Sequence, residues 1–476
     1  MMQRVHLIGL DFGTTTSSAV AASACVRRNA VNARMELSDF HECFRSEMVF
    51  TPYRDERLDL ERLDRYLHDW MKQADVDRNQ LFGGGALLTG LTAQAGNADV
   101  LVALIRRHLG DALIASADDP RLESWLAFMG CCAGLSQAHP RQRFLNLDIG
   151  GGTTNLALGQ AGEVRATGCL FVGARHFQVV PGTYRLLRLS TYAQALLEHL
   201  GCTRKPGDNL TQADRERILG FYVDLLEAVV TGDGDWLRRP IAQMHIQAPL
   251  PSPSNPESLA FTLSGGVGEL VYRHLHGEPW PSTTAFGDLG IDLAQRLVNA
   301  PFWANHWSRF QPAAGGRATV YGLLRHSTQV SGSTIFLQYP EDLPLRDLPI
   351  LGTIKDGASV AELIALAKGS PRGAAFRLML EDPTTATIRS FAARLREALQ
   401  ARAFPSHQLL VLFIAENVGK VLGQYVTAWG ASPLHLLVID ELTCHNAQYA
   451  SVGALRDQVI PVSFYGLSEE IEGPAS

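Results

Sequence analysis

The chain has 476 residues, of which 46% are hydrophobic and 19% are charged, and its formal net charge is −6. These proportions exclude a disordered chain, a collagen-like fibre and a disulfide scaffold. Mild acidity also argues against non-specific binding to nucleic acid or to a membrane surface. The cysteines form no CxxC pair, and no apolar run approaches the roughly 18 residues of a membrane span. We therefore expect a cytoplasmic protein with free thiols and about two to four domains.

The first expected element is a β-hairpin, because short apolar runs at residues 5–10 and 18–22 flank a turn of glycine and threonine. Apolar side chains then recur at helical spacing over residues 60–70, which predicts a surface helix. The glycines at residues 83–85 predict a break before the apolar run that follows them. Residues 121–135 predict a packed helix with several small side chains.

A second hairpin is expected at residues 144–158, around another turn of glycine and threonine. Thr211 with Asp214 predicts the start of a helix. After a proline-rich connector at residues 249–256, residues 259–264 predict a strand that runs into a glycine-rich turn.

The C-terminal part of the chain begins after a segment at residues 339–349 that contains three prolines. Strands are expected at residues 409–415 and 434–439, with a helix between them at residues 418–429.

One device occurs twice: an apolar strand ending in Leu-Asp runs into a turn of glycine and threonine. The repeat implies two related α/β halves that face each other. A triphosphate with Mg²⁺ needs backbone N–H groups that approach closely, hydroxyl donors, and a carboxylate that holds the metal through its waters. Asp11 and Asp148, at the strand ends, are therefore the candidate metal-binding and catalytic carboxylates. The candidate phosphate-binding residues are Gly13, Thr14, Thr15, Gly150, Gly151, Gly152 and Thr153.

A third motif, Ser264-Gly265-Gly266, ends the later strand. A pair of glycines lets a flat adenine lie against the backbone, so Gly265 and Gly266 are candidate adenosine-binding residues. In this order the three motifs resemble the phosphate 1, phosphate 2 and adenosine motifs of the actin, Hsp70 and sugar-kinase ATPase superfamily.

That superfamily places an interdomain helix with an acidic residue between its two phosphate motifs. Glu123 matches this residue, so the resemblance implies a catalytic role for it in orienting the attacking water. The alternative is a glutamate in the first turn of a helix that only stabilises the helix dipole.

A narrower resemblance runs along nearly the whole chain. It is carried by residues 115–124, 146–152, 263–269, 286–290, 331–335, 417–423 and 438–441. Together they resemble the ethanolamine ammonia-lyase reactivating factor family, which is similar to the large subunit of diol dehydratase reactivase. The resemblance implies a chaperone-like, weak ATPase that uses ATP and Mg²⁺ to release damaged cobalamin from ethanolamine ammonia-lyase, so that adenosylcobalamin can rebind. The chain departs from the family pattern at Leu91 and Gln94, where charged residues are usual.

These observations predict an α/β fold with two RNase H-like halves of the actin and Hsp70 type, at residues 1–140 and 141–330, around a nucleotide cleft. A C-terminal α/β domain is expected over residues 331–476. Two other functions stay open: a polymerising or scaffolding actin-like ATPase, and a small-molecule kinase of the same superfamily, for which the sequence offers no evident general base. A homo-oligomer is also left open.

Overall fold

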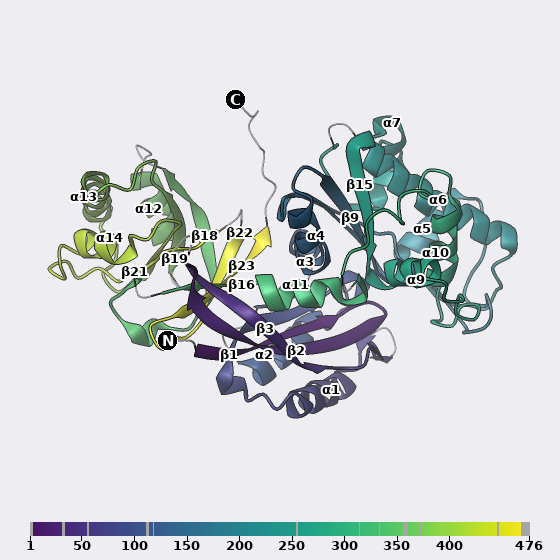
Figure 1. Ribbon diagram of the computed structural model, residues 1–476, viewed down its shortest axis with the longest axis horizontal. Coiled ribbons are helices and arrows are strands. Elements are labelled where there is room, and N and C mark those ends of the chain that lie inside the picture. The colour runs from purple at the N-terminus through teal and green to yellow at the C-terminus, as the bar shows by residue number, and fades with distance from the viewer. Residues whose placement is uncertain are drawn as a thin grey trace.

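A computed structural model shows the chain as three large β-sheets with helices packed around them (Figure 1). The structure describes residues 3–30, 34–54, 57–110, 114–117, 119–253, 256–313, 315–332, 334–355, 360–370, 373–444 and 447–467. Within these residues, no helix is both long enough and apolar enough to cross a membrane.

The first sheet contains the predicted N-terminal hairpin. The elements of this part are β1 (Gln3–Phe12), β2 (Thr16–Arg28), β3 (Met35–Arg45), β4 (Val49–Phe50), β5 (Tyr53–Arg54), β6 (Arg57–Leu58), α1 (Leu60–Gln73), β7 (Leu81–Leu88), α2 (Ala98–Leu109) and β8 (Ile114–Ala117). The strand order is β3-β2-β1-β7-β8, with β1 and β2 antiparallel and with β7 and β8 added in parallel. This is the RNase H-like order. Helices α1 and α2 bury their apolar sides against this sheet.

The glycines at residues 83–85 lie inside β7, so the predicted break at this place is wrong. A Cβ atom at Gly83 would lie 2.5 Å from Oγ1 of Thr328. Gly84 has a φ of +105°, and its N–H group donates to Oγ1 of Thr328 at 2.9 Å. The glycines are thus explained by the close approach of another segment to a buried strand, which short-range sequence signals do not reveal.

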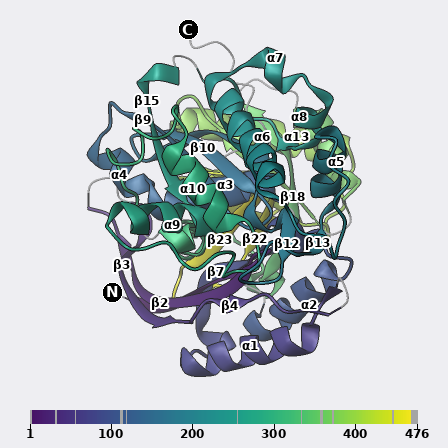
Figure 2. The ribbon, with the colours of Figure 1, turned by 90° about the vertical axis from the view of Figure 1, so that its right-hand side faces the viewer.

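The second sheet repeats the plan of the first. The elements of this part are β9 (Arg143–Ile149), β10 (Thr154–Gln160), β11 (Glu163–Leu170), β12 (Phe177–Val179), β13 (Leu186–Leu189), α5 (Thr191–His199), α6 (Gln212–Thr231), α7 (Gly234–Leu237), α8 (Pro240–Met244), β14 (Ile246–Ala248), β15 (Leu259–Ser264), α9 (Gly265–Leu275) and α10 (Gly290–Asn299). The order is β14-β11-β10-β9-β15, and β15 is parallel to β9 as β7 is to β1. The predicted second hairpin and the capping box of Thr211 with Asp214 are both confirmed. Figure 2 shows α6, α9 and α10 covering one face of this sheet.

Two helices cross where these sheets meet. They are α3 (Pro120–Cys131), which continues into α4 (Ala133–Ala138), and α11 (Ala318–His326). The segment predicted as one helix is therefore divided at Cys132. A Cβ atom at Gly130 of α3 would lie 2.5 Å from the backbone nitrogen of Gly322 in α11. The helices thus touch backbone to backbone, and Figure 1 shows them side by side.

The third sheet has eight strands. The elements are β16 (Thr328–Ser331), β17 (Phe336–Leu337), β18 (Leu345–Lys355), α12 (Val360–Lys368), β19 (Ala374–Met379), α13 (Thr385–Ala401), β20 (Leu410–Ile414), α14 (Gly419–Val426), β21 (Leu436–Ile439), β22 (Ala447–Val452) and β23 (Ile460–Leu467). The order is β16-β23-β22-β18-β19-β20-β21-β17, and β18 to β21 are parallel. The predicted C-terminal strands and helix are confirmed as β20, β21 and α14.

Candidate active site

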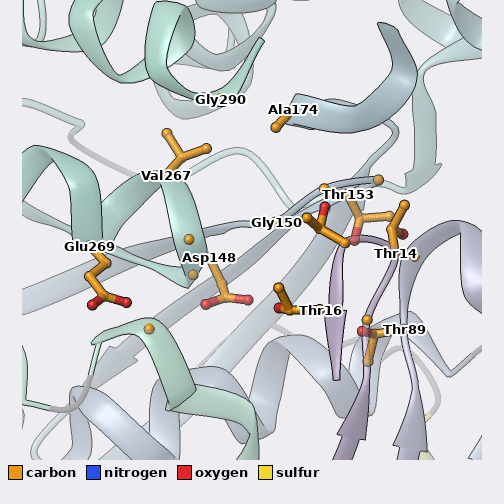
Figure 3. A pocket seen from close by; sticks show the side chains of 18 of the residues that line it. Thr14, Thr16, Thr89, Asp148, Gly150, Thr153, Ala174, Val267, Glu269 and Gly290 are labelled. Atoms are coloured by element: carbon orange, nitrogen blue, oxygen red, sulfur yellow. The ribbon is translucent and has the colours of Figure 1, made fainter. Parts of the chain in front are cut away.

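A cavity of about 250 Å³ lies where the hairpin turns of the first two sheets meet (Figure 3). Its lining comes from both turns and from the first turns of α3, α9 and α11. Every site residue predicted from the sequence lies in this lining: Asp11, Gly13, Thr14, Thr15, Glu123, Asp148, Gly150, Gly151, Gly152, Thr153, Gly265 and Gly266. The fold therefore brings the set together, while the roles of its members stay predictions.

The two turns share one hydrogen-bond pattern. The N–H group of Gly13 donates to the carbonyl of Thr16 at 2.9 Å, and that of Gly150 donates to the carbonyl of Thr153 at 2.9 Å. Because both N–H groups are used inside the turns, Gly13 and Gly150 shape the turns, and other N–H groups must serve any ligand. The sequence repeat thus corresponds to a structural repeat.

The turns also contact each other. A Cβ atom at Gly152 would lie 2.6 Å from Oγ1 of Thr14, and that hydroxyl accepts a hydrogen bond from the N–H group of Leu91 at 2.7 Å. Glycine is required at Gly152 because no side chain fits between the turns. The Oγ1 atom of Thr15 is buried here without a hydrogen-bond partner, which leaves one hydroxyl donor available in the cavity.

His176 contacts the backbone of the second turn. Its Nε2 atom lies 2.8 Å from the carbonyl oxygen of Gly152, and its Nδ1 atom lies 2.7 Å from Oγ of Ser190. Burial, with the nearby His245, lowers the pKa of His176 to about 3. The ring is therefore neutral, so Nε2 donates to Gly152 and Nδ1 accepts from Ser190.

Three of the carboxylates that line the cavity come from β1, β9 and α3, and each accepts a hydrogen bond from a neighbouring side chain. Asp11, at the end of β1, accepts a hydrogen bond from Oγ1 of Thr89 at 3.1 Å. Asp148, at the end of β9, accepts one from Oγ of Ser264 at 2.5 Å. Glu123, in the first turn of α3, accepts one from Nδ2 of Asn155 at 2.5 Å. The sheets supply the two aspartates, and the crossing helix supplies the glutamate.

The pKa values of all three carboxyl groups are raised. Burial raises the pKa of Asp11 to about 7, and the charge of Asp148 adds to this shift. Burial also raises the pKa of Asp148 to about 6. Burial, and then the charges of Asp11 and Asp148, raise the pKa of Glu123 well above its usual range. A bound cation would relieve this repulsion.

The carboxylates fit Mg²⁺ held through its own water molecules. No group of three or more acidic, histidine or cysteine side chains within the described ranges is arranged to hold a metal directly. Mg²⁺ usually keeps several waters and takes one or two carboxylates together with substrate phosphates. The donor set therefore suits an ion that arrives with a nucleotide.

The end of the cavity that is predicted to bind adenosine is formed where β15 runs into α9. Gly265 has a φ of +75°, and a Cβ atom there would lie 2.5 Å from the carbonyl oxygen of Ile149. Around Gly266, in contrast, nothing lies within 4 Å of the place of a Cβ atom. Gly265 is thus required by the backbone, whereas Gly266 leaves an open surface on the cavity side.

Several lining residues were missed by sequence reasoning. Asn155 donates to Glu123 and Thr89 donates to Asp11. Both lie close to the predicted turns, but neither forms a recognisable sequence motif. Asp288 is buried and lines the cavity, and burial raises its pKa to about 6. Arg317 lines the cavity at the start of α11, with Nη2 donating to the carbonyl of Ser46 at 2.6 Å. Its Nη1 atom is buried without a partner.

Two RNase H-like sheets that face each other across paired glycine–threonine turns, joined by crossing helices, define the actin, Hsp70 and sugar-kinase class of folds. The family profile described as "Ethanolamine utilisation protein EutA" matches residues 3–468. The chain therefore belongs to the EutA family.

Two relatives are similar over almost their whole length. The ethanolamine ammonia-lyase reactivase EutA of Escherichia coli (strain K12) is 32% identical over 476 residues, covering 97% of this chain and 98% of the relative. That of Salmonella typhimurium is 31% identical over 475 residues, with coverage of 97% and 98%.

Among solved structures, the ethanolamine utilization protein EutJ from Carboxydothermus hydrogenoformans is similar, with 13% identity, a TM-score of 0.29, and coverage of 67% of this chain and 89% of that chain. The Aquifex aeolicus Ppx/GppA phosphatase is also similar, with 14% identity, a TM-score of 0.31, and coverage of 59% and 74%.

Proposed function

We propose that the protein is an ATP-dependent reactivase of ethanolamine ammonia-lyase, which releases damaged cobalamin so that adenosylcobalamin can rebind. Membership of the EutA family supports the proposal, because two relatives carry the name ethanolamine ammonia-lyase reactivase. The ATP-dependent part of the proposal rests on the cavity, in which paired turns supply glycines and hydroxyls beside the carboxylates of Asp11, Glu123 and Asp148. These are the groups that a nucleotide with Mg²⁺ requires.

The phosphate end is proposed to use both turns. Asp11 and Asp148 are the carboxylates that would hold Mg²⁺ through its waters, and the bound ion supplies charge that neutralises the phosphates. The unpartnered hydroxyl of Thr15 can donate to a phosphate oxygen. Gly151 and Gly152 keep the two turns close together, because a Cβ atom at either position would meet Oγ1 of Thr15 or of Thr14.

Glu123 is proposed to orient the water that attacks the terminal phosphate. The hydrogen bond from Asn155 occupies Oε1, so Oε2 is the atom that can take a proton from water. Burial, and then the charges of the neighbouring aspartates, raise the pKa of Glu123. Positive charge beside them would lower it, and so favours the ionised glutamate once the nucleotide site is filled.

Coupling to a partner protein is proposed to depend on the crossing helices. Gly130 and Gly322 bring α3 and α11 into backbone contact, and we propose that the two sheets rotate relative to each other about this crossing. If the closed form of the cavity binds ATP more tightly, ATP shifts the population toward it. If the lyase binds one of the two forms more tightly, the free energy of ATP binding is coupled to lyase binding and can favour a different conformation of the lyase.

The test is reactivation of ethanolamine ammonia-lyase loaded with cyanocobalamin. Lyase activity should return when this protein, ATP, Mg²⁺ and free adenosylcobalamin are all present, and the released corrin should appear in the filtrate. Omitting ATP or using Asp148→Asn should abolish the recovery. Normal ATP hydrolysis with cyanocobalamin still bound would show that the lyase is the wrong partner.

The same preparations distinguish the other functions. Light scattering that rises with ATP would favour a polymerising actin-like ATPase, and phosphorylation of an added small molecule would favour a kinase. Our proposal places the protein in the cytoplasm with the lyase as partner, and it requires neither nucleic acid nor a membrane. Sedimentation with and without ATP would establish whether it forms a homo-oligomer.

A further inference from the structure

The end of β23 lies against the helices that cross beneath the cavity. Tyr465 and Leu467 pack on a small apolar cluster formed by Leu87 of β7, Leu122 and Leu126 of α3, and Leu323 of α11. Figure 1 shows β23 reaching from the C-terminal sheet toward these helices. One strand of the third sheet thus contacts the first sheet and both crossing helices.

Asp119 connects this strand to the helix that carries Glu123. Its Oδ1 atom accepts a hydrogen bond from the N–H group of Leu122 at 3.1 Å, which caps α3. Its Oδ2 atom accepts one from the N–H group of Gly466 in β23 at 2.7 Å. Its carbonyl accepts from the N–H group of Glu123 at 3.0 Å. A single residue therefore contacts the C-terminal sheet and the backbone of a candidate catalytic residue.

A second connection holds the same strand end in place. The hydroxyl of Tyr465 donates to Oδ1 of Asp347 in β18 at 2.6 Å. The same Asp347 oxygen accepts from Nη2 of Arg106 in α2 at 3.1 Å. Because α2 packs against the first sheet, this bridge connects the end of β23 to that sheet, in addition to the contact with Asp119.

We propose that Asp119 is a positioning residue for Glu123, and that its bond to Gly466 transmits the state of the nucleotide cavity to the C-terminal sheet. A helix cap fixes the first turn of its helix, so a tilt of α3 on nucleotide binding moves Asp119 together with Glu123. The carboxylate bond to Gly466 is charge-assisted, and the strand end therefore follows that movement. This inference rests on the proposed nucleotide function.

Two substitutions separate the cap from the link. Asp119→Asn keeps an oxygen for Leu122, since asparagine caps helices as well as aspartate does, but it turns an amide donor toward the N–H group of Gly466. Asp119→Ser keeps a capping hydroxyl and removes the second acceptor without creating repulsion. The matched control is Asp59→Asn, because Asp59 caps α1 by accepting from the N–H group of Arg62 at 3.2 Å, away from the cavity.

The experiment is hydrogen–deuterium exchange of residues 460–467, with and without ATP and Mg²⁺, together with the rate of ATP hydrolysis. In the unaltered protein and in Asp59→Asn, ATP should change the exchange of this segment. In Asp119→Asn and Asp119→Ser, the segment should exchange at least about tenfold faster, the ATP-dependent change should be lost, and hydrolysis should fall about threefold to tenfold. If Asp119→Asn does not fold, the exchange and hydrolysis measurements on Asp119→Ser alone test the proposal.

The possible failures are distinguishable. ATP binding by the unaltered protein, seen as a thermal shift, with no change in exchange at residues 460–467 would overturn the link and leave the proposed function standing. A lowered unfolding midpoint in the Asp119 variants, with an ATP-dependent change of normal size, would make Asp119 structural only and also overturn it. Absence of ATP binding in the unaltered protein would overturn both proposals.

Discussion

Replacing Gly266 by valine is the most direct test of the proposal that this end of the cavity binds adenosine. Nothing lies within 4 Å of a Cβ atom at this position, so the empty protein has room for the new side chain. Valine also has a somewhat higher helix propensity than glycine, and Gly266 lies in α9. We therefore expect the free energy of unfolding without nucleotide to stay unchanged or to rise slightly.

With nucleotide the result should reverse. If adenine lies against Gly266, the branched side chain occupies its place, and overpacking of this kind costs about 1–3 kcal/mol. The dissociation constant for ATP should then rise roughly 5-fold to 150-fold. Isothermal titration with ATP and Mg²⁺ measures this change. Inorganic tripolyphosphate with Mg²⁺ lacks the base, so its affinity should be the same for both proteins.

Gly265→Val is the matched comparison, one residue away. Here a φ of +75° and the carbonyl of Ile149, 2.5 Å from the place of a Cβ atom, oppose any side chain. The left-handed backbone alone costs roughly 1–2 kcal/mol, so this variant should unfold at lower urea without any nucleotide. Wild-type ATP affinity in Gly266→Val would refute the placement of adenine, and an equal loss of stability in both variants would indicate glycines needed only for the turn.

Three further predictions concern the carboxylates and the crossing helices. Asp11→Asn or Asp148→Asn should lower ATP hydrolysis about 100-fold to 1000-fold while circular dichroism stays unchanged, and wild-type turnover in either would contradict their proposed role. Burial raises the pKa of Asp11 to about 7 and that of Asp148 to about 6. A carboxyl group whose pKa is higher in the folded than in the unfolded protein stabilises the folded state fully below its unfolded pKa, near 4. That stabilisation is lost as the pH rises through the folded pKa values of about 6 and 7. Urea midpoints of the nucleotide-free protein should therefore fall from pH 5 to pH 8, and less so in Asp11→Asn; a flat profile would be inconsistent with burial of the aspartates. Gly322→Ala should lower the free energy of unfolding by about 1–3 kcal/mol, because its Cβ atom would meet the backbone of α3. Gly220→Ala, where nothing lies within 4 Å, is the control that should not destabilise, and equal behaviour of the two would argue against a close crossing.

The parts of the fold that follow from local patterns were predictable from the sequence. Each hairpin lies within a short segment, so the repeated Leu-Asp strand with its turn predicted two related α/β halves and the cavity residues of both turns. The prediction of Glu123 came from the superfamily resemblance instead. The capping box at Thr211 likewise involves residues only three positions apart.

The parts that depend on distant contacts were not predictable. The sequence could not show that Gly83 and Gly84 lie in a strand against Thr328, because that contact joins segments more than two hundred residues apart. Gly265 and Gly266 look equivalent in sequence, yet only Gly265 has a positive φ. The pairing of Asn155 with Glu123 similarly needs the second sheet to pack on α3.

The place of β23 within the third sheet has a consequence for biosynthesis. Although it is the last strand along the described chain, it lies between β16 and β22 and pairs with both. While the ribosome is still translating this region, β16 and β22 have exposed edges that await a neighbour, and exposed edges invite pairing with other chains. Completion of the third sheet must therefore wait until residues 460–467 have left the exit tunnel, so a nascent chain arrested before this point is the form most in need of a general chaperone.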